Sequence, residues 1–217
     1  MKLILEWTYR TKSGASTTFT SPQLTPHEAL LFAEDIEKTG RVKQLTITDE
    51  YDSTWMMKEL KKYIKELETE PHDITLYFDG SFDHHSNTAG LGIVIFYTQN
   101  NMRYRLRKNT HFEYIESNNE AEYAALSFAI NECIELGAHH QPINIKGDSQ
   151  VVINQMNGEW PAYEKNLARW ADQIDALLIK HGFEASYEFI ARNYNKEADQ
   201  LANQALQGIE ISAISKQ

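Results

Sequence analysis

The chain has 217 residues and a formal net charge of −10, from 21 basic and 31 acidic side chains. Its 41% hydrophobic and 24% charged residues are typical of a folded globular protein, not of a disordered one. No apolar run approaches the length of a membrane span. The single cysteine, Cys133, excludes both an internal disulfide and a cysteine-rich zinc site. The net negative charge argues against nucleic-acid binding by bulk charge alone. We therefore expect a cytoplasmic protein with no membrane partner, because an acid at position 6 also comes too early for a signal peptide.

An acidic run that ends at Pro71 divides the chain into two parts. Residues 1–72 carry 10 basic and 12 acidic residues, a balance of −2, whereas residues 73–217 carry 11 and 19, a balance of −8. We expect a small α+β accessory domain over 1–70, a larger domain over 73–208 and a C-terminal tail over 209–217.

The accessory domain is predicted to mix short strands with two helices. Thr25 can cap a helix in which Pro26 suits the first position and Glu28 completes a capping box, and Gly40 ends that helix. The predicted strands cover 2–10, 16–20, 45–48 and 54–56, and the second helix covers 58–67.

The larger domain is predicted to be α/β. The segments rich in β-branched or aromatic residues, which predict strands, cover 74–79, 90–98, 101–109, 143–146 and 185–190. The predicted helices cover 119–136, 149–155, 163–181 and 197–206. This order favours a mixed five-stranded sheet flanked by helices, with an antiparallel start and parallel strands reached through helices.

Four acids lie where a predicted strand ends or where a predicted helix faces the sheet. Asp79 closes the first strand of the larger domain, and Gly80 after it lets the backbone turn sharply. Asp148 closes a second apolar strand beside another glycine. Glu122 and Asp199 each share a helix face with apolar residues, where a carboxylate is costly to bury without a partner.

Each acid alone is explained equally well as a cap or as a residue at the edge of a helix. Together they need a counter-charge, and no lysine or arginine is predicted on the same faces. Hard divalent cations with oxygen ligands would supply it, and Mg²⁺ is the usual ion where phosphates are the substrate. Two such ions can promote phosphodiester hydrolysis.

Four motifs in order resemble those of the type 1 ribonuclease H family, over about residues 73–208. They are Asp79-Gly80-Ser81, Ser117–Tyr123, Gly147–Gln150 and Asn195–Asn203. The resemblance implies a ribonuclease H-like fold, two Mg²⁺ ions with Mn²⁺ as an alternative, and endonucleolytic cleavage of the RNA strand of RNA–DNA hybrids. It also implies that the catalytic residues and metal ligands are Asp79, Glu122, Asp148 and Asp199.

The same resemblance assigns residues to substrate binding. Asn118, Asn119 and Gln150 match positions that reach the minor groove of the hybrid, where 2′-hydroxyls distinguish RNA from DNA. A helix cap for Asn118 and plain surface polarity for Gln150 are the alternatives. The remaining expected contacts are Gly80, Ser81 and Arg192; Ser81 is equally well explained as a turn residue.

Two departures from the family pattern keep a second function open. The loop over 82–90 lacks the proline and the first glycine of the family's usual loop, and the 51 residues from Asp148 to Asp199 hold no insertion rich in lysine or arginine. Arg103, Arg105 and Arg107 are the nearest substitute, as a phosphate track or as a solvated strand face. The alternative is a catalytically weak ribonuclease H-like module that binds nucleic acid or protein. An exonuclease is disfavoured, because Asp79-Gly80-Ser81 is not Asp-x-Glu.

The partner of the accessory domain is left open. A substrate adaptor, a protein-binding module, a dimerising unit and a purely structural role all remain, and the balance of −2 argues against strong phosphate binding.

Overall fold

Two separate hydrophobic cores form along the chain in the computed structural model, which describes residues 1–217. They belong to two compact units, Met1–Thr69 and Glu70–Gln217. No helix in the structure has the length and apolar character needed to cross a membrane.

The first unit packs two helices against an antiparallel sheet with the strand order β2-β1-β3-β4. Its strands are β1 (Leu3–Arg10), β2 (Ser16–Thr20), β3 (Val42–Asp49) and β4 (Thr54–Trp55), and its helices are α1 (Pro26–Lys38) and α2 (Met57–Thr69). The predicted capping box is confirmed, because the Thr25 hydroxyl accepts from the Glu28 N–H while the Glu28 carboxylate accepts from the Thr25 N–H. Leu3, Leu5 and Leu60 are fully buried between sheet and helices.

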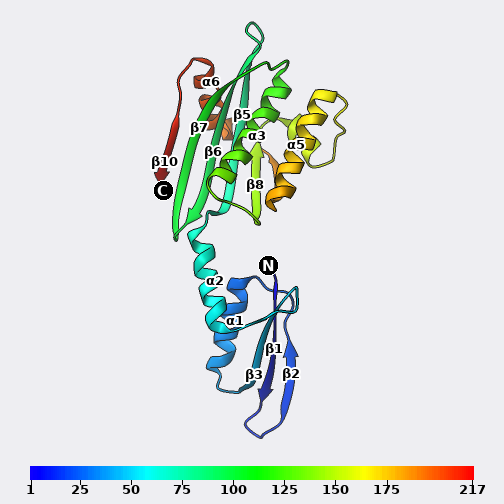
Figure 1. Ribbon diagram of the computed structural model, residues 1–217, viewed down its shortest axis with the longest axis vertical. Helices are drawn as coiled ribbons and strands as arrows, with labels where there is room; N and C mark the ends of the chain where they lie inside the picture. The colour runs from blue at the N-terminus through cyan, green and yellow to red at the C-terminus, as the bar shows by residue number, and fades with distance from the viewer. The chain divides into compact units, whose positions relative to one another are not determined.

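The second unit is built on a six-stranded sheet with the order β10-β7-β6-β5-β8-β9 (Figure 1). Its strands are β5 (His72–Asp83), β6 (Thr88–Gln99), β7 (Met102–Glu113), β8 (Pro142–Gly147), β9 (Glu184–Phe189) and β10 (Ser212–Lys216). The pairs β5–β8 and β8–β9 are parallel and the others are antiparallel, so the expected mixed α/β sheet is confirmed.

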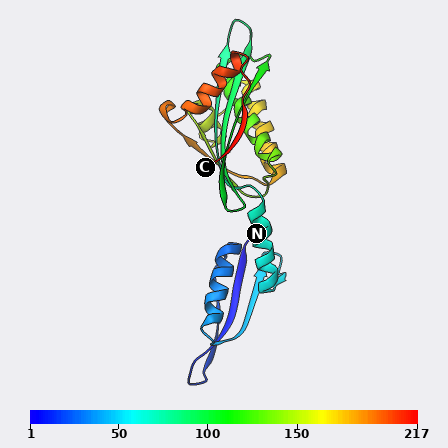
Figure 2. The same cartoon turned by 90° about the vertical axis from the view of Figure 1, so that its left-hand side faces the viewer.

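Helices cover both faces of this sheet. Helix α3 (Asn118–Glu135) lies on β5 and packs against α5 (Lys165–His181) on one face, whereas α6 (Lys196–Leu206) crosses β6 on the other face (Figure 2). The short α4 (Gln150–Met156) follows β8, and the 3-10 turn Arg192–Tyr194 precedes α6. Because α3 and α6 lie on opposite faces, side chains from both can reach the strand between them.

The sheet differs from the sequence expectation in two places. The segment 209–217, expected as a tail, forms β10 along β7, because Asn109 at 6% exposure holds the chain that leads into it. Its amide donates to the Leu201 and Ile209 carbonyls, and its Oδ1 accepts from the Ile211 N–H. The second difference is that β5 does not end at Asp79, because its pairing with β6 continues to Asp83.

Candidate active site

Asp79 lies in the interior of β5, opposite Gly92 on β6. A Cβ atom at Gly92 would collide with the Ala198 carbonyl of α6. The missing side chain therefore lets the first turn of α6, which carries Asp199, approach the strand pair that holds Asp79. The Asp79 side chain is 6% exposed.

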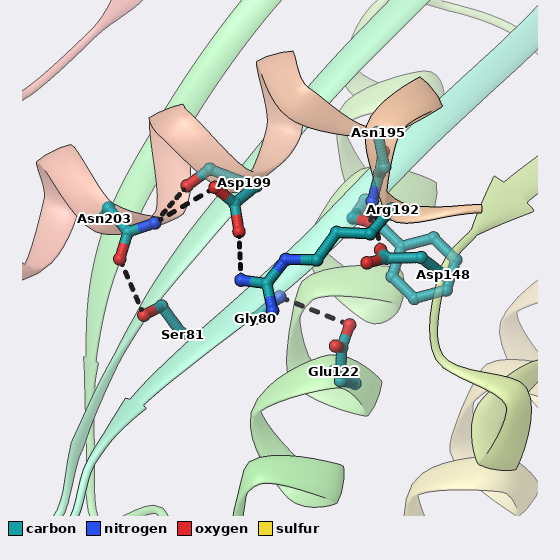
Figure 3. A network of polar contacts seen from close by, with 9 residues as sticks. Gly80, Ser81, Glu122, Asp148, Arg192, Asn195, Asp199 and Asn203 are labelled. Atoms are coloured by element: carbon teal, nitrogen blue, oxygen red, sulfur yellow. Dashed lines mark hydrogen bonds and ion pairs between the residues drawn. The ribbon is translucent and has the colours of Figure 1, made fainter. Parts of the chain in front are cut away.

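Glu122 reaches the same place from α3. A Cβ atom at Gly80 would collide with the backbone of Ala121 and Glu122, so Gly80 brings this helix close to β5. The Gly80 N–H donates to Glu122 Oε2 at 3.3 Å (Figure 3). The sequence predicted that Gly80 turns the backbone out of the strand. In the structure Gly80 is instead a buried residue within β5, at the point where α3 comes close to the strand.

Asp148 follows β8, as expected, and is fixed by a residue from the start of α6. Asn195 Nδ2 donates to Asp148 Oδ1 at 2.6 Å and to the Phe78 carbonyl at 2.8 Å. The parallel ladder between β5 and β8 ends at Tyr77 and Lys146, one residue before Phe78 and two before Asp148. The Asn195 amide thus links the two strands where their own hydrogen bonding stops, and it holds Asp148 near Asp79.

Asp199 lies in the first turn of α6 and accepts from Arg192 Nη2 at 2.6 Å. Arg192 is 78% exposed, so this ion pair faces solvent. Asn203, one turn further on, donates to the Asp199 carbonyl at 2.8 Å and accepts from the Ser81 hydroxyl at 3.1 Å (Figure 3). No lysine or arginine was predicted on the faces of the four acids, and Arg192 was predicted as a substrate contact; the structure places Arg192 beside Asp199, from the turn before α6.

The acids lie close enough together to repel one another. Burial raises the pKa of Asp79 to about 7, with further upward contributions from Asp148 and Asp199 and an opposing one from Arg192. Burial also raises the pKa of Glu122 well above its usual range, and Asp79 and Asp148 add to that shift. The fold therefore keeps two carboxyl groups in a place where their charged forms are poorly compensated.

This donor set has the chemistry of a site for hard divalent cations. The four carboxylates could supply oxygen ligands, and a cation beside Asp79 and Glu122 would offset the burial and repulsion that raise their pKa values. In this structure no group of three or more acidic, histidine or cysteine side chains is already gathered as a set of ligands, and Arg192 supplies the nearby positive charge.

The other predicted substrate residues lie at the starts of two helices. Asn118 and Asn119 begin α3, where the cap is the Ser117 hydroxyl, which accepts from the Glu120 N–H. The helix cap is therefore Ser117, and the alternative interpretation of Asn118 as the cap is wrong. The first residue of α4 is Gln150, and its side chain is exposed.

Two positioning residues, Asn195 and Asn203, were missed as individual residues. An asparagine directly before a helix is normally interpreted as its cap, but the Asn195 side chain makes no capping bond and serves Asp148 instead. The only sequence signal for Asn195 and Asn203 was that they are the first and last residues of the fourth motif.

The arginine-rich strand is partly neutralised within the fold. Arg107 Nε lies 2.7 Å and Arg105 Nη1 lies 3.4 Å from Glu197 Oε1 on α6. Both side chains are about 30% exposed, whereas Arg103 is exposed. The two expectations for these arginines were a track of unpaired residues that binds phosphates and a strand face fully exposed to solvent. Neither describes all three residues.

Comparisons with known proteins agree with this architecture. A profile of the family described as reverse transcriptase-like matches residues 77–205. The chain is 48% identical over 194 residues to the uncharacterized protein YpeP of Bacillus subtilis, covering 89% of this chain and 85% of that protein. It is 36% identical over 91 residues to ribonuclease HI of Halobacterium salinarum, covering 42% of this chain and 44% of that protein.

A solved structure also superposes on this chain. RNase H1 from Halobacterium salinarum superposes with a TM-score of 0.53 and 29% identity, over 62% of this chain and 98% of that one. The superposition leaves 38% of this chain uncovered, and the family profile over 77–205 lies within the second unit alone.

Proposed function

This chain belongs to the reverse transcriptase-like family and carries a ribonuclease H-like domain, and from this we propose that it hydrolyses the RNA strand of RNA–DNA hybrids with divalent cations. The observation that supports the proposal is the mutual repulsion of these acids: burial raises the pKa of Asp79, with Asp148 and Asp199 adding to the shift, and burial raises the pKa of Glu122, with Asp79 and Asp148 adding to it. The name of the Halobacterium relative, ribonuclease HI, supports the same reaction class.

In this proposal Asp79, Glu122, Asp148 and Asp199 hold two Mg²⁺ or Mn²⁺ ions. When bound, the ions would activate the attacking water and stabilise the departing 3′-oxygen. The protein contributes the arrangement of the ligands: Gly80 N–H orients Glu122, Asn195 orients Asp148, and Asn203 links α6, which carries Asp199, to Ser81 on β5.

The substrate contacts belong to the same proposal. Asn118, Asn119 and Gln150 begin two helices of the ribonuclease H-like unit, and their amides would hydrogen-bond 2′-hydroxyls in the minor groove of the hybrid. Ser81 and Gly80 lie on β5 directly after Asp79, and Arg192 is free to meet a phosphate once it leaves Asp199.

The test is cleavage of an end-labelled RNA–DNA hybrid with Mg²⁺ or Mn²⁺ by the wild-type chain and by Asp79→Asn. Duplex DNA, duplex RNA and single strands are incubated in parallel, and Asp35→Asn, an exposed change in the first unit, is the matched control. We expect cutting of the hybrid alone, retained in Asp35→Asn and lost in Asp79→Asn.

One observation favours a second function, a module that binds nucleic acid but cuts weakly. Arg192 already supplies a positive charge to Asp199, as it would in a site that works without metal ions. Hybrid binding by the wild-type chain with no cleavage in either metal would support this alternative and contradict the proposed hydrolysis.

A further inference from the structure

Four cations of the first unit surround one hollow. The hollow measures about 380 Å³ and is lined by Arg10, Lys12, Arg41 and Lys43 together with Thr11, Gly40 and Val42. These are four of the ten basic residues in 1–72, and no acidic residue lines the hollow. We call this hollow, with its four cationic side chains, the basic hollow. The net charge of residues 1–72 is only −2, yet this part of their surface carries four positive charges.

The backbone around the basic hollow is ordered by its own hydrogen bonds. In the turn between β1 and β2, the Thr11 N–H donates to the Ala15 carbonyl at 2.8 Å, and the Ala15 N–H donates to the Thr11 hydroxyl at 3.1 Å. On the other side, the Arg10 N–H donates to the Arg41 carbonyl at 2.8 Å. Lys12 and Arg41 are thus held on two neighbouring segments that face one hollow.

A β-bulge adds the fourth cation. Thr8 pairs with Gln44 and Tyr9 pairs with Val42, so Lys43 is the extra residue between two registered pairs. Bulges redirect side chains and recur beside functional sites. Without this insertion the strand would present one cation fewer at the same edge.

Nothing within the chain neutralises these four charges. None of the four takes part in an ion pair, although Lys61 and Lys62 of the same unit both do. The guanidinium of Arg41 donates to the Tyr9 hydroxyl at 2.6 Å, which fixes its position without removing its charge. Four like charges around one hollow repel one another, so their arrangement costs free energy unless an external anion compensates them.

We propose that the basic hollow binds the phosphate backbone of nucleic acid and so gives the first unit a role in holding the substrate. Lysine and arginine on a shared surface bind phosphates and release their counterions. The choice of nucleic acid, and not another polyanion, rests on the proposed function of the second unit. A membrane surface is less well matched, because apart from Val42 the lining is polar or charged.

The test is equilibrium binding of a fluorescent RNA–DNA hybrid to the full chain in EDTA, where cleavage does not interfere. Lys12→Ala/Lys43→Ala is compared with Lys58→Ala/Lys65→Ala, which removes the same charge from exposed positions on α2. Two lost phosphate contacts lower the slope of log affinity against log salt by about 1.8, which corresponds to about 60-fold weaker binding at roughly 0.1 M salt when the affinities at about 1 M salt are equal. The α2 control is expected to bind like the wild type.

Three outcomes would overturn this inference. They are equal loss of binding in both double variants, no change in the Lys12/Lys43 variant, and lysine-dependent sedimentation with phosphatidylserine vesicles without nucleic-acid binding. Failure of the proposed hydrolysis is recognised separately, because Asp79→Asn leaves the basic hollow intact. A chain that binds hybrid through Lys12 and Lys43 but never cleaves it would retain this inference and lose the proposed function.

Discussion

Single side chains in the candidate site differ in how the fold compensates their charge. Asp199 has the Arg192 guanidinium and Asp148 has the Asn195 amide, whereas Asp79 and Glu122 are buried with raised pKa values. The unfavourable electrostatics are therefore concentrated on the strand–helix contact at Gly80.

Asp79→Asn is expected to stabilise the protein when no divalent cation is present. The change removes a buried charge that Asp148 and Asp199 repel, and we expect the free energy of unfolding to rise by about 1–3 kcal/mol at about pH 8. Thermal unfolding in EDTA measures it, with Asp35→Asn as the control. A less stable Asp79→Asn protein would mean that the carboxylate makes stabilising contacts that outweigh the repulsion.

The stability of the metal-free protein should fall as the pH rises towards and through about 7. The folded pKa of Asp79 is about 7 and its ordinary value is 3.8, so the folded state binds the extra proton. The associated stability is fully present below about pH 4 and is lost as the pH rises through the folded pKa.

Mg²⁺ should reverse this loss, so the rise in Tm on adding Mg²⁺ should grow between about pH 6 and 8. Unfolding curves in EDTA and in Mg²⁺ over that interval measure the effect. A Mg²⁺ shift that is the same at each pH would contradict binding at Asp79.

At the scale of elements, Asn109 joins three segments that are distant in the sequence. Asn109→Ala removes its bonds to Leu201, Ile209 and Ile211, of which the first is buried and the other two are partly buried. We expect a loss of about 2–4 kcal/mol in unfolding free energy and loss of amide protection in β10. Hydrogen exchange on this variant and on Asn193→Ala, an exposed control, measures both. Retained protection of Ser212–Lys216 would show that β10 is held by its ladder with β7 alone.

Local signals predicted most elements, and distant contacts account for the misses. The helix that begins after Thr25 was predicted correctly because its capping box lies within four residues of sequence. Strand β10 was missed because Asn109, about 100 residues away, secures its start. The four acids were predicted as a set from their places at strand ends and on helix faces and from the motif order, but Asn195 acts on residues 117 and 47 positions away, beyond any local pattern.

At the scale of the whole molecule, two separate cores predict two unfolding events. Leu60 lies fully buried in the core of the first unit. Leu60→Ala should lower the stability of that unit by about 2–4 kcal/mol and leave the second largely unchanged. Ile174→Ala, in the other core, is the reciprocal variant, and amide exchange read separately for the two units measures both. Joint loss of protection in either variant would show that the units unfold as one.

The bulge at Lys43 has a consequence for insertions and deletions. The pairs on either side of it, Thr8 with Gln44 and Tyr9 with Val42, would become consecutive if Lys43 were deleted. A one-residue deletion normally shifts every later side chain of a strand to the opposite face. Here it should leave the inward-facing Leu45 and Ile47 in place and remove one cation, so relatives can gain or lose this charge through a single codon without refolding the sheet.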